Sequence, residues 1–150
     1  MSDTKPSSSD AKLIMQLYDL RREAEMRKAR QWFGEKFWPE SFEEFIKVAF
    51  DFGSQESAWL RQVGSYWEMA ASFVARGVLD PGLFYDNCGE MWFVYVKVKP
   101  FIAKMRQAVG SNEFMANVER VAEGTPEGRA RVQRMLQNFE RMKQLRVGAK

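Results

Sequence analysis

The chain has 150 residues and a formal net charge of +3, and 45% of the residues are hydrophobic, 14% aromatic and 29% charged. These values are typical of one globular domain that buries about 70% of its unfolded surface on folding, and they exclude a disordered or fibrous chain. The sequence has no histidine and one cysteine, which excludes Ser-His-Asp and Cys-His catalysis, histidine-ligated zinc or haem, and an internal disulfide.

The N-terminal segment is polar and rich in serine. We therefore expect residues 1–9 to form a flexible lead-in, without a secretory signal, and residues 10–150 to form a single helical domain. The most apolar stretch, residues 91–103, is interrupted by two lysines and a proline, so no window reaches the ~18 uncharged residues of a membrane span. The cysteine, Cys88, lies in an apolar run and favours a reducing, cytoplasmic location.

A first long helix is expected between Asp10, which can cap it, and Pro39, which stops it. In its first half, apolar side chains recur at the 3.6-residue period, at Leu13, Leu17, Leu20 and Ala24. The apolar face then rotates to Met26, Trp32, Phe33 and Phe37. The two ends of this helix are therefore expected to contact different neighbours.

Two further helices have clear start and stop signals. Ser41 and Glu44 form a capping box before a short helix that ends at Gly53. Ser54 caps the next helix, which ends at Gly77. Its apolar residues fill one half of the helical wheel, at Trp59, Leu60, Val63, Tyr66, Trp67, Ala70, Phe73 and Val74.

The segment 88–109 is the best candidate for a central helix. Asp80-Pro81 begins a short helix or turn that leads into it. Its Val, Tyr and Phe content favours a strand, but its polar residues favour a helix, because they form two narrow stripes: Glu90, Lys97 and Lys104 in one, Lys99 and Arg106 in the other. Pro100 is expected to kink this helix.

The remaining signals predict two more helices. Gly110 ends the central helix, and Ser111 or Asn112 caps a short one. Thr125-Pro126 starts the last helix, whose apolar face holds Val132, Met135, Leu136, Phe139 and Met142. The sequence therefore predicts an all-α, compact bundle of about five or six helices with the central helix near residues 88–109.

The C-terminal segment carries the basic character of the chain. Residues 125–150 hold seven Lys or Arg and two Glu. A possible binding surface for phosphate groups consists of Arg129, Arg131, Arg134, Arg141, Lys143 and Arg146. No helix-turn-helix, RRM or KH pattern accompanies these charges, so the competing interpretation is a solvated helix that docks on the bundle. Membrane-surface binding is less favoured, because the apolar face is modest and has no Trp.

No constellation of residues indicates a catalytic or metal centre. Glu68 and Glu90 suggest acid/base chemistry, but both lie on polar helix faces and are expected to be solvated or paired. Glu68, Lys99 and Arg106 form a possible polar constellation that could face solvent, one another or a cavity. The 21 aromatic residues could line a ligand pocket or simply fill the core. Without a nucleotide-binding motif either, no catalytic residue, metal or other cofactor is expected.

Residues 66–107 resemble a segment of small uncharacterised all-helical proteins of bacteria and phages. The shared features are the Trp67-Glu68 pair, Gly77 followed by Leu79-Asp80, a Trp- or Tyr-bearing helix, Pro100 and Arg106. The resemblance implies an all-helical fold and a bacterial origin. It carries over no catalytic residue, because that family has no assigned activity.

The sequence leaves the function unknown and three hypotheses open. The leading one is a non-enzymatic module for protein–protein interaction or self-association through the amphipathic terminal helices. The alternative is nucleic-acid binding through the basic helix within residues 125–150. The third is a small-ligand carrier or enzyme with an aromatic-lined cavity. The sequence identifies neither the partner nor the oligomeric state.

Overall fold

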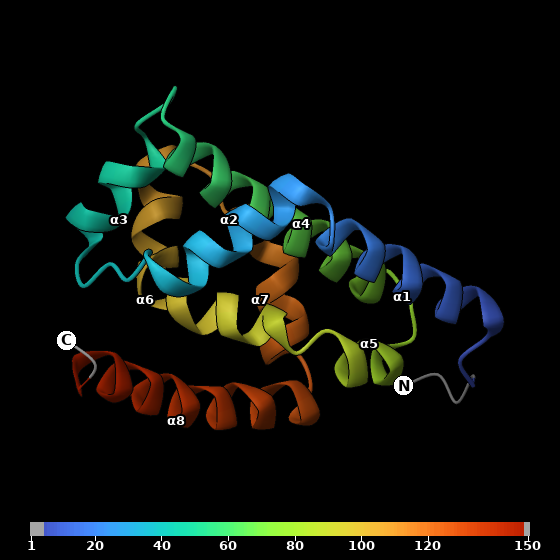
Figure 1. Cartoon of the computed structure of the whole chain (residues 1–150). Coiled ribbons are helices and arrows are strands. Elements are labelled where there is room, and N and C mark those ends of the chain that lie inside the picture. Colours follow the sequence, from blue (N-terminus) through green and yellow to red (C-terminus); the bar gives the residue numbers. More distant parts are fainter. Residues whose placement is uncertain (1–4, 149–150) are drawn as a thin grey trace. The chain divides into compact units, whose positions relative to one another are not determined.

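The computed structural model describes residues 5–148, which contain eight helices and no strand (Figure 1). The all-α prediction is confirmed, and the number of helices exceeds the expected five or six. The difference arises because the first long helix is broken in two and because the segment after Asp80 forms a helix of its own. None of the helices in the described range is long and apolar enough to cross a membrane.

The chain divides into two compact units, Met1–Cys88 and Gly89–Lys150, and each is described by itself. The first unit holds α1 (Ser8–Arg21), α2 (Ala24–Glu35), α3 (Phe42–Ala49), α4 (Gln55–Ala75) and α5 (Pro81–Asn87). The second holds α6 (Glu90–Val109), α7 (Ala116–Glu123) and α8 (Pro126–Gly148). That residues 10–150 form a single domain stays a prediction.

The N-terminal helix begins at Ser8, inside the segment expected to be a lead-in, because Ser7 caps it. The Ser7 hydroxyl accepts the Asp10 N–H at 3.2 Å, and the Asp10 carboxylate accepts the Ser7 N–H at 2.7 Å. Asp10, the expected cap, is thus the reciprocal partner in a capping box. Of the expected lead-in, residues 1–4 lie outside the described residues.

The expected continuous helix is interrupted at residues 22 and 23. The Glu23 carboxylate accepts the N–H groups of Glu25 and Met26 at 3.0 and 2.9 Å and so starts α2 as a new helix. The predicted stripe through Leu20 and Ala24 is wrong, because α1 ends before it is complete. Leu20 is 51% exposed; the buried side chains of α1 are Ile14, Leu17 and Arg21.

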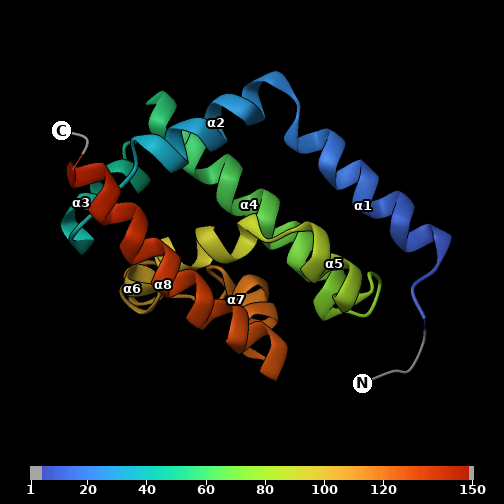
Figure 2. The ribbon, with the colours of Figure 1, turned by 60° about the horizontal axis from the view of Figure 1, so that its bottom comes forward.

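The other helices of the first unit begin and end close to the predicted signals. Ser41, Ser54 and Asp80 cap α3, α4 and α5 by accepting the N–H groups of Glu44, Ser57 and Leu83. Gly53 and Gly77 have φ angles of 101° and 76°, a conformation that favours glycine after a helix. Helix α4 packs on α2 and α3 (Figure 2).

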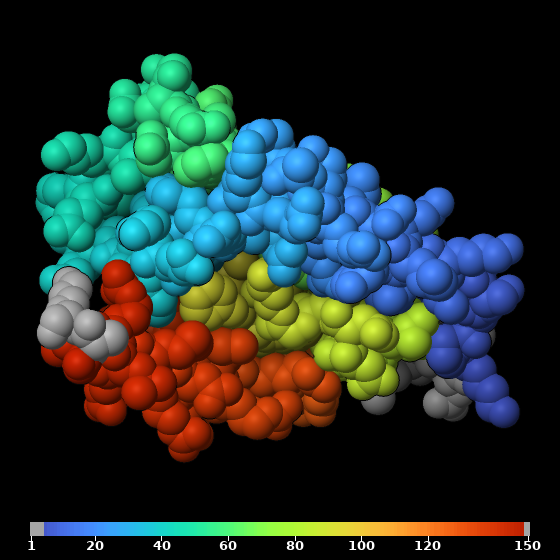
Figure 3. All heavy atoms as spheres, viewed as in Figure 1, coloured from blue at the N-terminus to red at the C-terminus, as the bar shows by residue number. Residues whose placement is uncertain are grey.

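Two long-range hydrogen bonds hold α1 to the rest of its unit. The Tyr66 hydroxyl on α4 donates to the Leu17 carbonyl at 2.5 Å. The Asp80 N–H at the start of α5 donates to the Asp10 carboxylate at 2.9 Å. These bonds orient the buried side of α1, and the other side of the helix lies at the surface that Figure 3 shows in blue.

In the second unit α6, α7 and α8 pack against one another. Gly110, with a φ angle of 67°, ends α6 as predicted, and the helix continues through Pro100. The Trp92 indole N–H donates to the Gly128 carbonyl at 3.1 Å. The rings of Phe93 and Phe139 lie 6.2 Å apart. The apolar side of the last helix therefore docks on its own unit.

Candidate binding surfaces

The six basic residues of the predicted phosphate-binding surface are spread around α8. Arg131 is half-buried, with its Nε 3.0 Å from the Glu127 carboxylate and its guanidinium 5.7 Å from the Trp92 ring centre. Arg134 lies 4.0 Å from the same carboxylate oxygen. Arg129 donates to the Glu123 carbonyl at 2.9 Å. Several of these cations therefore have partners within the unit.

Helical geometry separates the remaining positive charges. At ~100° per residue, Arg129 and Lys143 flank one side of the buried stripe of α8, while Arg134 and Arg141 lie on the other side of the helix. Arg146 lies in line with the buried stripe and is half-buried. The four exposed cations are therefore divided between two sides of the helix.

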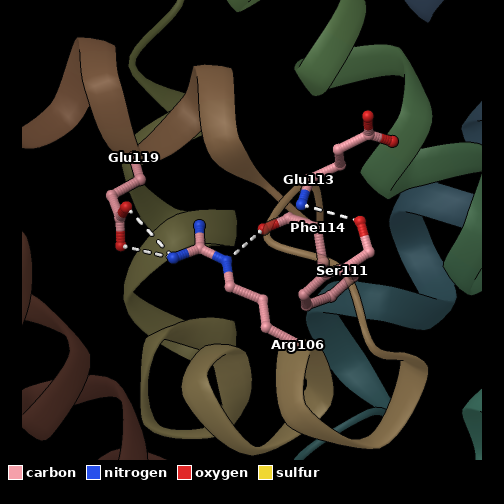
Figure 4. A network of polar contacts seen from close by, with 5 residues as sticks. All are labelled: Arg106, Ser111, Glu113, Phe114 and Glu119. Atoms are coloured by element: carbon pink, nitrogen blue, oxygen red, sulfur yellow. Dashed lines mark hydrogen bonds and ion pairs between the residues drawn. The ribbon is translucent and has the colours of Figure 1, made fainter.

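Lys99 and Arg106, which the sequence places in one polar stripe, both face acidic residues of α7. The Lys99 ammonium lies 3.8 Å from the Glu123 carboxylate. The Arg106 guanidinium lies 3.2 Å from the Glu119 carboxylate (Figure 4). Burial, and then the carboxylates of Glu123 and Glu119, raise the pKa of the neighbouring Tyr95 hydroxyl. These pairs join α6 to α7.

Arg106 also fixes the connection between these helices. Its Nε donates to the Phe114 carbonyl at 3.0 Å, and the Ser111 hydroxyl accepts the Glu113 N–H at 3.2 Å (Figure 4). Met115, which follows, has a φ angle of 57°, unusual for a residue with a side chain. The Arg106 contacts therefore hold a backbone conformation that the chain would not adopt easily.

An open hollow of about 510 Å³ adjoins this connection. Its lining residues are Ala103, Arg106, Gln107, Gly110, Ser111 and Asn112. None of them is aromatic, so this hollow does not match the expected aromatic-lined cavity. The largest fully buried side chains include Trp67, Trp92 and Phe84, which serve as core.

Glu68, the third member of the predicted polar constellation, is half-buried on α4 in the first unit. Lys99 and Arg106 belong to the second unit, where each pairs with a carboxylate of α7. In the described part of the chain, no group of three or more Cys, Asp or Glu side chains could hold a metal ion.

A surface on α1 that the sequence did not single out combines apolar and cationic side chains. Ala11, Met15, Tyr18 and Arg22 are all exposed and follow the spacing i, i+4, i+7, i+11, which aligns them along one face of the helix. Met15 is 72% exposed and Tyr18 53%. We call these four residues the α1 seam.

Two guanidinium groups lie against the ring of Tyr18. Arg22 is 5.5 Å from its centre, and Arg21 is 5.7 Å from it and 5.3 Å from the ring of Trp67. Arg21 is 8% exposed. Among the described residues, neither guanidinium has a hydrogen bond or an ion pair, and the buried Trp67 indole N–H has no hydrogen-bond acceptor.

The sequence contains a signal for this cluster, since Arg21 and Arg22 follow Tyr18 by three and four residues, a spacing that lets side chains meet on a helix. Both arginines stand near the middle of the segment expected to form one long helix between Asp10 and Pro39, among residues of both charge signs. In the structure α1 ends at Arg21, so both arginines lie at the end of a helix.

Comparison with known proteins gives one match. The chain belongs to the family described as a domain of unknown function (DUF4760), whose model matches residues 6–125. This range includes α1 and ends just before α8. Searches of curated proteins and of solved structures gave no match. The predicted likeness to an uncharacterised family is thus confirmed, and no function is assigned to the family.

Proposed function

For this member of a family without an assigned activity, we propose a non-enzymatic protein-interaction module that binds its partner through the α1 seam. The observation that carries the proposal is the exposure of Met15 and Tyr18 beside two arginines that have no counterion among the described residues. Tyr and Arg are enriched among the residues that dominate binding energy in protein interfaces.

The spacing of the seam supports a helical partner. Residues 11, 15, 18 and 22 are separated by four, three and four positions, the separation of alternating core positions in a two-heptad coiled coil. A partner helix laid along this face would cover the exposed thioether of Met15 and the ring of Tyr18. An aromatic side chain buries about 150–250 Å² when it is fully covered.

Differential capture tests the proposal. The immobilised full chain, its Tyr18→Ala variant and its Leu145→Ala variant would be exposed to lysate of the source organism. Leu145 is an exposed leucine on α8 and serves as the matched control. We expect proteins that the wild type and the control retain and the Tyr18→Ala variant loses. Retention that does not depend on Tyr18 would contradict the proposal.

Nucleic-acid binding through α8 is the second candidate, and the exposed pair Arg134 and Arg141 favours it. Their separation from Arg129 and Lys143 counts against a long phosphate-binding track. Binding of this kind predicts that affinity falls steeply with salt and falls again in an Arg134→Gln/Arg141→Gln variant. DNA and RNA retention that the double substitution leaves unchanged would exclude it.

We also propose a cytoplasmic location in a bacterium. The free, buried thiol of Cys88 supports a reducing compartment, and the resemblance of residues 66–107 supports the bacterial origin. Measured localisation of a tagged full chain in its source organism tests both.

A further inference from the structure

We infer that the partner of the α1 seam is an acidic amphipathic helix, which places carboxylates on Arg21 and Arg22 while its apolar side covers Met15 and Tyr18. The inference rests on the proposed function and names the chemistry of the partner. It is carried by contacts within the first unit.

The first argument is the environment of Arg21. The Arg21 side chain keeps 8% of its surface exposed, and its guanidinium has five N–H donors. The guanidinium stacks on Tyr18 and Trp67, but the described residues offer it no acceptor. The Trp67 indole N–H, buried beside it, also lacks an acceptor. An incoming carboxylate would supply the missing acceptor.

The second argument is that two of the chain's nearby carboxylates, those of Asp10 and Glu23, are engaged elsewhere. Asp10 accepts hydrogen bonds from Ser7 and Asp80, and these bonds lower the pKa of its carboxyl group. Glu23 accepts two N–H groups at the start of α2, which lower its pKa as well. Asp19 makes no ion pair among the residues described. Among the described residues, no carboxylate pairs with Arg21 or Arg22, and an acidic partner would supply one.

The third argument distinguishes an acidic partner from a second copy of this chain. The exposed seam carries Arg22 and no acidic residue. Paired side by side in parallel, two copies would bring Arg22 against Arg22, and paired antiparallel they would bring it against Ala11. Neither arrangement places a carboxylate of the seam on Arg22. Opposite charge across an interface favours the correct partner and raises the association rate.

The test uses two designed helical peptides with the same leucine seam at four-three-four spacing. One carries two glutamates positioned to meet Arg21 and Arg22, and the other carries glutamines there. Binding to the full chain is measured by fluorescence anisotropy. Because a charge-assisted bond to arginine is worth about 1.5–3 kcal/mol, we expect the glutamate peptide to bind at least about tenfold more tightly at low salt.

Two variants with the same net charge provide the control. Arg22→Gln should reduce the preference for the glutamate peptide to about twofold or less, whereas Lys28→Gln, on α2, should leave it unchanged. Lys28 is an exposed cation in an ion pair with Glu25. Equal binding of both peptides, or a preference that survives Arg22→Gln, would overturn the inference.

The same measurements separate this inference from the proposed function. If Tyr18→Ala weakens both peptides equally and neither is preferred, the α1 seam remains the binding surface and the acidic partner is wrong. If Tyr18→Ala changes nothing, the proposed function fails as well. A dimer in light scattering that Met15→Glu dissociates would identify a second copy as the occupant and overturn the inference.

Discussion

Gly128 is the position where the structure makes the sharpest energetic prediction. A Cβ atom added there would lie 2.5 Å from the Val121 carbonyl oxygen and 2.7 Å from that of Ala122. Both atoms belong to the backbone of α7, so neither can rotate away. The Gly128 carbonyl also accepts the Trp92 indole N–H at 3.1 Å. Gly128→Ala must therefore move α8 away from α7 and strain that hydrogen bond.

The magnitude follows from three contributions. Overpacking costs about 1–3 kcal/mol, and a weakened buried hydrogen bond adds about 1 kcal/mol. The better helix propensity of alanine offsets about 1 kcal/mol of this destabilisation. We therefore expect Gly128→Ala to lower the free energy of unfolding by about 2 kcal/mol, which corresponds to a fall in Tm of roughly 4–8 °C for a chain of this size.

The chain offers a matched control in Gly64, inside α4, where an added Cβ meets nothing within 4 Å. Gly64→Ala should raise the free energy of unfolding by about 0.5–1 kcal/mol. Thermal and urea denaturation, followed by circular dichroism, would measure both variants. If Gly128→Ala is as stable as the wild type, the close approach of α8 and α7 is wrong.

Three further predictions concern single side chains. Tyr66→Phe removes the hydrogen bond to the Leu17 carbonyl and should lower the free energy of unfolding by about 1 kcal/mol; a neutral effect in urea denaturation would contradict that bond. Burial lowers the pKa of Lys97, which is 3% exposed, to about 7, and the unfolded chain therefore binds more protons between pH 7 and 10. Stability should rise with pH over that range, and Lys97→Met should remove the rise and stabilise the fold at pH 7 by up to about 4 kcal/mol; a slope that persists in the variant would refute the assignment. Hydrogen bonds from Ser7 and then Asp80 lower the pKa of Asp10. The contribution of Asp10 to the free energy of unfolding is therefore fully present above the pKa of the unfolded chain, near 4, and is lost as the pH falls further. Asp10→Asn should reduce the loss of stability at acid pH, and an unchanged loss would exclude this role.

Local signals in the sequence predicted most of the helix ends correctly. Ser41, Ser54 and Asp80 act as caps, and Gly77 and Gly110 follow helices in the left-handed conformation. These signals work because a cap acts on the backbone within three or four residues of it. Such local signals carry no information about the contacts between helices.

The break between α1 and α2 shows why a local pattern can mislead. A glutamate is not among the preferred cap residues, so nothing marked Glu23 as the start of a helix. The apolar spacing of Leu20 and Ala24 instead suggested continuation. Local patterns could not predict the ion pairs of Lys99 and Arg106 with α7 either, because these pairs join residues more than twelve positions apart.

The same break explains how the α1 seam arises. Since α1 ends at Arg21, its buried side is fixed by Ile14, Leu17 and Arg21, and the seam residues Met15 and Tyr18 are left outside. A helix that buries an arginine while exposing a tyrosine and a methionine departs from the usual pattern of burial. Such departures tend to occur where function, and not stability, determines the residues. Under the proposed function, one partner would cover the exposed apolar face and pair with the two arginines that have no counterion among the described residues.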